Sequence, residues 1–167
     1  FIIELLKTKI KEISEDFAIS EFKKYLIKIN ENHTICSYCP DKGIKVVVGD
    51  LNSDNLLDVI VQYQFEQNEE DKQFGQSGIY GCVGFVVFIN NRGTLDVSQK
   101  VDVSDILTYS VSESVTIKKI EDNGEIILEK LVDRKWDDSF NSERDEQYLT
   151  KTYKTKIALG KIAPIVL

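Results

Sequence analysis

The chain has 167 residues, of which 42% are hydrophobic, and its formal net charge is −7 at pH 7. This length is sufficient for one domain with a buried core, so we expect residues 1–167 to form a single domain. The acidic balance, without a dense stripe of Lys and Arg, argues against nucleic-acid binding. No apolar run approaches the ~20 residues of a membrane helix, so no membrane insertion is expected.

Helical periodicity characterises the N-terminal segment, residues 1–35. Apolar side chains recur three or four positions apart, with Lys and Glu on the other face. Ser14, followed by Glu15 and Asp16, is typical of a helix cap with acids in the first turn. The pattern predicts two successive helices, or one helix broken between Ser14 and Ser20, covering a sheet. A helix on a membrane surface is the alternative, but acidic residues dilute its basic face.

From residue 44 onward, short β-branched and aromatic runs alternate with turn residues. Asn91-Arg92-Gly93 and Asp122-Asn123-Gly124 predict hairpins, and Asn-Gly in the second suits a two-residue turn with both residues at positive φ. Residues 44–167 are therefore predicted to form an antiparallel sheet. The fold class is α+β, with the N-terminal helix or helices packed on a twisted antiparallel β-meander. The predicted strands are Ile44–Val48, Leu57–Phe65, Tyr80–Ile89, Thr94–Val101, Ser114–Glu121, Glu125–Leu131 and Tyr148–Ile157.

Two polar segments, Glu66–Ser77 and Asp133–Glu146, are predicted to be long loops between strands, and such loops often carry function. The second contains Trp136, followed by Asp137 and Asp138. These three residues form a predicted contact for a protein partner, because exposed aromatic residues are enriched at binding hot spots. The alternative is that Trp136 folds back onto the edge of the core.

The most distinctive chemistry lies between two predicted strands, at residues 50–58. Side-chain oxygens occur at the first, third, fifth and ninth positions of this segment. Ca²⁺ takes six to eight oxygen ligands at about 2.3–2.6 Å, which a short loop of this kind can supply. An EF-hand is excluded, because its twelfth position needs a bidentate Glu and this chain has Val61 there. A tight turn, in which Asp and Asn bind nearby amides, is the alternative.

The residues DLNSDNLLD resemble the D-x-N-x-D-G-x-x-D loop of FG-GAP and VCBS-type repeats, which lies between antiparallel strands and commonly holds Ca²⁺. Asn55 stands where the repeat has Gly, an exchange that is tolerable because Asn readily adopts positive φ. The resemblance implies a calcium site with side-chain oxygens from Asp50, Asn52, Asp54 and Asp58 and a backbone carbonyl from Leu56.

Repeats of these families build propellers, which need the motif at a regular period, and this chain has a single copy. It is more similar to bacterial, mostly exported proteins of unassigned role with one such loop, a strand of the type LxVFxNxxG and a C-terminal hairpin. Gly84–Gly93, GFVVFINNRG, matches the strand, and the resemblance covers Ile44–Leu159. It implies a periplasmic or extracellular location.

The three cysteines admit several uses. Cys36 and Cys39 form a C-x-x-C segment, and Cys82 stands in a predicted strand. Zinc would need His33 as a fourth ligand, and a redox dithiol normally precedes a helix, whereas this segment precedes a turn. In an exported protein a disulfide is favoured, which would join Cys36 to Cys39 or either of them to Cys82. Buried free thiols are the alternative.

Catalytic motifs are lacking, since His33 is the single histidine and the sequence contains no phosphate loop, dinucleotide fingerprint or H-E-x-x-H pair. The sequence therefore predicts a non-enzymatic, extracytoplasmic interaction domain that is stabilised by Ca²⁺ and binds a protein partner. One alternative is an inhibitor or immunity protein against a basic toxin or hydrolase, since acidic surfaces speed encounters with basic targets. Another is an enzyme whose Asp loop leaves a metal coordination position open.

Overall fold

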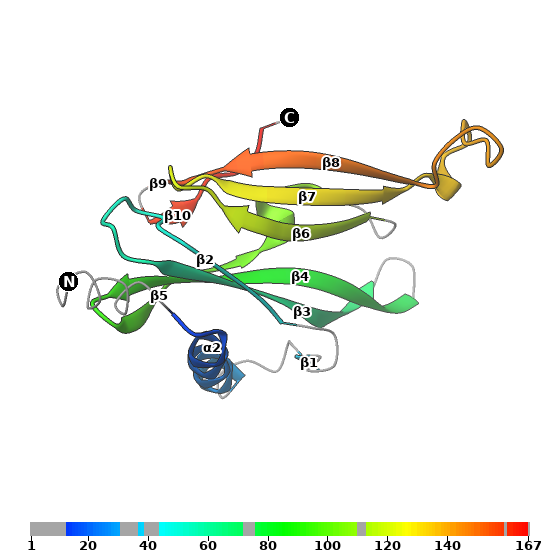
Figure 1. The fold of residues 1–167 in the computed structure, drawn as a ribbon. Coiled ribbons are helices and arrows are strands. Elements are labelled where there is room, and N and C mark those ends of the chain that lie inside the picture. Colours follow the sequence, from blue (N-terminus) through cyan, green and yellow to red (C-terminus); the bar gives the residue numbers. More distant parts are fainter. Residues whose placement is uncertain are drawn as a thin grey trace.

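The computed structural model describes residues 13–30, 37–38, 44–71, 76–109, 113–158 and 160–166. In this part the chain is mainly β, with antiparallel sheets of five, three and two strands and one α-helix. Figure 1 shows the helix, the five-stranded sheet and the three-stranded sheet stacked in that order. The prediction of a helix packed on antiparallel strands is confirmed at this level, but the strands belong to separate sheets.

Strand β3 is the centre of the five-stranded sheet, since it pairs with β4 on one side and with both β1 and β2 on the other, while β5 pairs with β4. In the three-stranded sheet β7 lies between β6 and β8. The elements are α2 (Glu15–Asn30), β1 (Ser37–Tyr38), β2 (Lys45–Gly49), β3 (Asp58–Asp71), β4 (Gln76–Asn91), β5 (Thr94–Asp102), β6 (Glu113–Ile120), β7 (Ile126–Asp133), β8 (Tyr148–Thr155), β9 (Ile157–Ala158) and β10 (Lys161–Ile162), with the 3-10 turns η2 (Val103–Asp105) and η3 (Arg134–Trp136).

The prediction of a long loop at Glu66–Ser77 is wrong for the residues that the structure describes there, 66–71 and 76–77. Strands β3 and β4 continue into this segment as an antiparallel pair, from Glu66 opposite Gly81 to Asp71 opposite Gln76. Paired backbones satisfy one another's hydrogen bonds whatever side chains they carry, so a polar composition does not by itself end a strand. The Asp133–Glu146 segment is a connection, as predicted, with η3 at its start.

The main hydrophobic core lies between the two larger sheets. Phe85 and Val87 of β4 are fully buried in it, together with Ile117 of β6 and Leu128 of β7. One polar side chain crosses this core: Gln62 of β3 accepts a hydrogen bond from the Ile117 backbone N–H through Oε1, at 2.8 Å. A buried Gln62 side chain or Ile117 N–H without a partner would cost free energy. The alignment of the two sheets that allows this hydrogen bond is therefore favoured.

A second core lies between α2 and the other face of the five-stranded sheet. Ala18 and Phe22 are fully buried there, and the Phe22 ring lies 5.1 Å from that of Tyr63 on β3. Ser14 caps the helix, since its Oγ accepts the Phe17 N–H at 3.2 Å, as predicted. The helix α2 runs without interruption from Glu15 to Asn30, and residues 1–12, where the prediction places the preceding helical segment, lie outside the described residues. No helix in the described part of the chain is long and apolar enough to cross a membrane.

The two predicted hairpins form with different turns. Arg92 and Gly93 have φ of 53° and 101°, which makes the first a two-residue turn between β4 and β5. The second is a three-residue connection in which Gly124 alone has positive φ, at 79°, and Glu121 N–H donates to the Glu125 carbonyl. The prediction that both Asn123 and Gly124 have positive φ is therefore wrong.

Replacing Gly84 of β4 by Ala is expected to lower the free energy of unfolding by about 1–3 kcal/mol through overpacking. A Cβ at this position would lie 2.6 Å from Cζ of Tyr63, whose ring is buried beneath α2. Denaturant unfolding measures the effect. The double variant Gly84→Ala, Tyr63→Leu removes the opposing ring and should lose less than the sum of its single changes, whereas additive losses would contradict this account.

Candidate metal centre

Residues 50–57 connect β2 to β3 at the point where Gly49 pairs with Asp58. Two residues of this connection, Ser53 and Asn55, have positive φ, at 62° and 67°. Asn tolerates this conformation better than other non-Gly residues, so Asn55 serves where the resembling loops have Gly. The chain turns sharply enough to bring three polar side chains over the interior of one loop.

Side-chain oxygens of the loop accept hydrogen bonds from its own backbone. Asp50 accepts the Asp54 N–H through Oδ1 at 3.2 Å and the Asn55 N–H through Oδ2 at 2.9 Å. Asn52 Oδ1 also accepts the Asp54 N–H, at 3.2 Å, and Asp54 Oδ1 accepts the Leu56 N–H at 2.8 Å. These bonds are the hydrogen bonds of a tight turn, which is the alternative to a metal site. A carboxylate oxygen has two lone pairs, so one such bond leaves room for a cation.

Asp58 differs from the other acids of the loop because its side chain is fully buried. Its Oδ2 accepts the Leu51 N–H at 2.8 Å, and its Oδ1 accepts the Asn90 N–H at 2.9 Å. Burial raises the pKa of this carboxyl above its ordinary value, and the negative charges of Asp54 and Asp50 act in the same direction, while the two amide bonds oppose them. The three carboxylates are thus close enough to repel one another.

Asn90 also contacts the loop, although the sequence predicts no role for it beyond its place in the matched strand. Its side chain is buried, its Nδ2 donates to the Leu57 carbonyl at 3.0 Å, and its Oδ1 accepts the Gly93 N–H at 2.8 Å. It therefore joins the end of the Asp loop to the β4–β5 turn. An Asn next to a turn, at the end of an apolar strand, was the available signal.

The β6–β7 turn supports the loop from the other sheet. A Cβ at Gly124 would lie 3.2 Å from the Leu51 carbonyl oxygen and 3.3 Å from that of Asp50. Only a residue without a side chain allows this approach at positive φ. The Asp loop is therefore held by Asn90 on one side and by Gly124 on the other.

The side-chain atoms that the loop offers to a metal are oxygens, and oxygens are the ligands that a hard cation such as Ca²⁺ prefers. Within the described ranges no group of three or more His, Cys, Asp or Glu side chains is arranged as around a metal ion. The predicted set contains three acids, Asp50, Asp54 and Asp58, but in the structure both oxygens of Asp58 accept backbone amides instead of facing the interior of the loop. The other predicted ligands are the Asn52 amide and the Leu56 carbonyl. Asp50, Asn52, Asp54 and Leu56 would hold the ion, with Asp58 beneath them.

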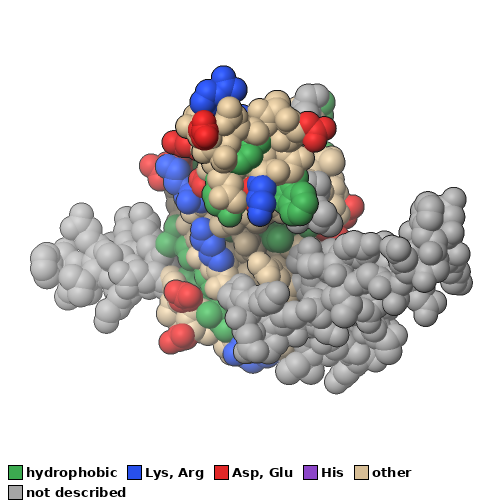
Figure 2. Space-filling model, turned by 90° about the vertical axis from the view of Figure 1, so that its right-hand side faces the viewer, with side chains coloured by type: hydrophobic (Ala, Val, Ile, Leu, Met, Phe, Trp, Pro, Cys, Tyr) green, Lys and Arg blue, Asp and Glu red, His purple; other side chains and the backbone are tan. Residues whose placement is uncertain are grey.

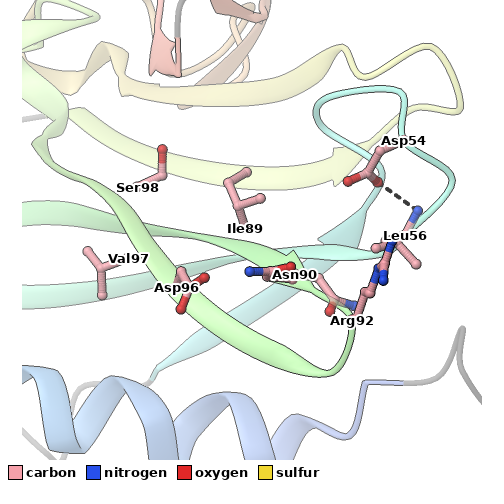
Figure 3. Close-up of a pocket in the computed structure, with 9 residues that line it drawn as sticks. Asp54, Leu56, Ile89, Asn90, Arg92, Asp96, Val97 and Ser98 are labelled. Carbon is pink, nitrogen blue, oxygen red and sulfur yellow. Dashed lines mark hydrogen bonds between the residues drawn. The ribbon is translucent and has the colours of Figure 1, made fainter.

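A cleft of about 670 Å³ lies beside the loop, between it and the β4–β5 hairpin (Figure 3). Asp54 and Leu56 line it from the loop, and Arg92, Asp96 and Ser98 line it from the hairpin and β5. His33 lies outside the described residues, as do Cys36 and Cys39 of the predicted disulfide, while Cys82 stands on β4 opposite Phe65.

The predicted partner-contact residues lie far from the loop, at the other end of the molecule (Figure 1). The Trp136 side chain is 75% exposed, so it does not pack on the edge of the core. Asp137 and Asp138 follow it and are also exposed. The structure therefore separates the two predicted sites.

No protein-family model, no curated protein and no solved structure matches this chain. The geometry of the two sites therefore carries the functional argument.

Proposed function

We propose that this chain is a non-enzymatic, extracytoplasmic interaction domain in which Ca²⁺ bound at residues 50–58 stabilises the junction of β2 and β3. The supporting observation is that this short loop gathers the carboxylates of Asp50, Asp54 and Asp58, with the first two close enough to act on the charge of the third. The resemblance of DLNSDNLLD to single-copy FG-GAP and VCBS-type loops of exported bacterial proteins supports the calcium site and the location.

A cation would act here through charge. Burial is the main cause of the raised pKa of Asp58, and the negative charges of Asp54 and Asp50 add to it because they repel its carboxylate. A bound Ca²⁺ neutralises this repulsion and so stabilises the folded state. The metal is structural in this proposal, and the protein partner binds elsewhere on the domain.

Calcium is expected to raise the melting temperature of the wild-type protein relative to a sample with chelator. At a free concentration a hundredfold above its dissociation constant, the gain in unfolding free energy is about 2.7 kcal/mol, because only the folded state binds. Isothermal titration and thermal melts measure binding and stabilisation. Asp50→Ala and Asp54→Ala should lose both.

Asp96→Ala is the matched control, because it removes one exposed carboxylate near the loop without changing a proposed ligand. Asp50→Asn tests the ligand directly, since it retains an amide acceptor for the turn and loses the charge. If wild type and Asp96→Ala do not respond to calcium, or if all variants respond equally, the loop is only a turn and the proposal is wrong.

An inhibitor or immunity protein against a basic toxin or hydrolase is a narrower form of the same proposal. The net charge of −7 supports it, because opposite charge accelerates association with a basic target. In this form, too, Ca²⁺ stabilises the domain and the partner is a protein.

A further inference from the structure

Exposed apolar side chains are concentrated on one hairpin. Of the seven large hydrophobic side chains that are exposed in the described part of the chain, four lie between residues 131 and 149, which we name the hairpin tip. These are Leu131, Trp136, Tyr148 and Leu149, with exposed fractions of 38%, 75%, 52% and 43%. Single exposed apolar residues are ordinary, but a local concentration indicates a contact surface.

Two of these side chains share a face with each other. Tyr148 pairs with Asp133, and Leu131 pairs with Thr150, so Tyr148 and Leu131 are diagonal neighbours on the same side of the β7–β8 ladder. This is the outer side, because Leu128, three positions from Leu131, points into the core between the sheets. Trp136 stands in η3, where the pair of strands ends.

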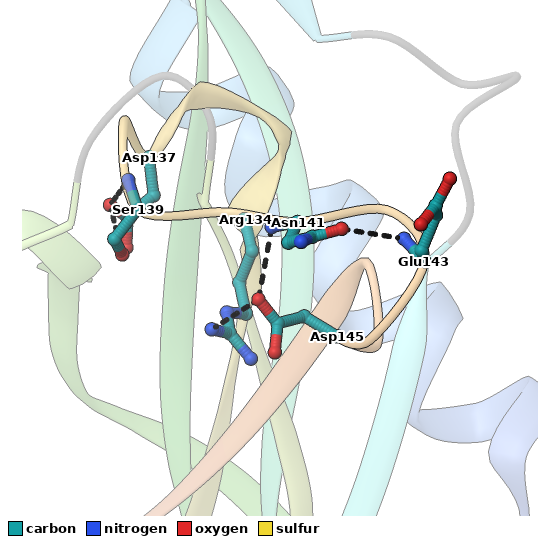
Figure 4. A network of polar contacts seen from close by, with 6 residues as sticks. All are labelled: Arg134, Asp137, Ser139, Asn141, Glu143 and Asp145. Carbon is teal, nitrogen blue, oxygen red and sulfur yellow. Dashed lines mark hydrogen bonds and ion pairs between the residues drawn. The ribbon is translucent and has the colours of Figure 1, made fainter.

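The connection that carries Trp136 is ordered by its own hydrogen bonds, several of which are drawn in Figure 4. The Arg134 guanidinium lies 3.7 Å from Asp145, whose Oδ2 also accepts the Asn141 N–H at 3.0 Å. Asp137 Oδ1 accepts both the backbone N–H and the hydroxyl of Ser139, at 2.9 and 2.8 Å. A connection held in this way loses little conformational entropy when it binds.

The tip is also acidic. Residues 133–147 contain six Asp and Glu and three Lys and Arg, a net charge of −3 out of −7 for the whole chain. The hydrogen bonds from Ser139 hold the pKa of Asp137 below its ordinary value, so this carboxylate stays charged. Figure 2, viewed toward this end of the molecule, shows apolar side chains interspersed with charged ones on its upper part.

We propose that the hairpin tip is the docking surface of this domain and that its occupant is a basic protein segment with apolar side chains, into which Trp136 inserts. The indole and the Leu131–Tyr148 pair contact the apolar side chains of the partner, and Asp137 and Asp138 face its Arg or Lys. Such a centre of aromatic contact within a charged rim is typical of binding hot spots. The inference rests on the proposed role as an interaction domain but not on calcium.

Trp136 is the only Trp of the chain, so its fluorescence reports on this surface alone. The probe is a short synthetic peptide that alternates Arg and Leu, titrated against the full chain. We expect saturable binding with a blue shift of the emission, as the indole leaves water. Peptides that alternate Arg with Ser, or Glu with Leu, should bind at least about tenfold more weakly, because each lacks one of the two contacts.

Charge-matched variants separate docking from general attraction. Asp137→Asn with Asp138→Asn should weaken binding of the Arg-Leu peptide severalfold, and Glu15→Gln with Asp16→Asn, on the exposed start of α2, should leave it unchanged. Trp136→Ala, followed by calorimetry, should weaken it about tenfold or more. Absence of a blue shift, equal affinity for all three peptides, or equal losses in the two double variants would overturn the proposal.

The titration is run with calcium and with chelator. Docking at the tip with no response to calcium at the Asp loop would overturn only the proposed metal role. A calcium response without docking would overturn only the tip.

Discussion

Asp58→Ala is expected to lower the free energy of unfolding by about 3 kcal/mol in the absence of calcium. The buried carboxylate accepts one amide from Leu51 and one from Asn90, so its removal leaves two N–H groups without acceptors. Each unsatisfied buried donor costs about 1–3 kcal/mol. Denaturant titration at neutral pH with chelator measures the loss.

Asp54→Ala is the matched control, because it removes an exposed acid from the same loop whose carboxylate accepts the Leu56 amide and the Asn52 side chain. Its loss should stay within about 1 kcal/mol. Equal losses in the two variants would show that Asp58 contributes nothing beyond an ordinary turn residue.

The pH dependence has a defined sign. Burial places the folded-state pKa of Asp58 above its ordinary value of 3.8, so the folded protein binds this proton more tightly than the unfolded chain does. The part of the stability that comes from this raised pKa is fully present below the ordinary pKa and is lost as the pH rises through the raised value, whereas the two amide hydrogen bonds remain. Without calcium, the stability advantage of wild type over Asp58→Asn should therefore shrink with rising pH, and a constant difference would contradict the raised pKa.

Phe85→Ala and Phe88→Ala are each expected to cost about 3–5 kcal/mol, the usual effect of deleting a buried aromatic side chain. Both rings come from β4 but they point to opposite faces, Phe85 into the core between the sheets and Phe88 into the core beneath α2. Because β4 connects the two cores, we expect one unfolding transition that includes the helix.

Circular dichroism of the helix and fluorescence of a Trp introduced at Tyr153, which packs on the core between the sheets, follow the two ends of this structure separately when Trp136 is changed to Phe. Coincident transitions in both variants would support one cooperative unit. Val97→Ala, at a position that is 41% exposed, should change the stability by about 0.5 kcal/mol or less. Loss of the helix signal before the fluorescence transition in Phe88→Ala would show that α2 unfolds on its own.

Local patterns predicted much of the secondary structure. The cap at Ser14 and the hairpin at Arg92–Gly93 follow from nearby residues alone, and both are found. The predicted strands from Ile44 to Val101 and from Ser114 to Ile157 correspond to β2–β5 and to β6–β8. The alternation of apolar and polar residues shows that one face of a strand is buried, but not which strands pack against it. The division into separate sheets was therefore not predictable, and neither were contacts between them such as that of Gln62 with Ile117.

The candidate site was predicted from the sequence in part. The spacing identified the loop and the residues whose oxygens turn inward, since an Asp or Asn acts on amides two to five positions away. An Asn beside a turn indicates the local bond between Asn90 and Gly93, but it does not report the contact of Asn90 with Asp58, 32 residues away. The approach of Gly124 to Leu51 joins the other sheet to the loop in the same non-local way.

Strand β8 has consequences for self-association. Among the described strands it pairs only with β7, so one of its edges presents backbone donors and acceptors to the surroundings. Such an edge is a template on which another chain can add a strand. Lys151 and Lys154 are exposed on this strand. A second copy of β8 added at the edge would place its own lysines near them, and the like charges would repel one another. We therefore expect these lysines to disfavour the addition of a second copy of the domain at the β8 edge.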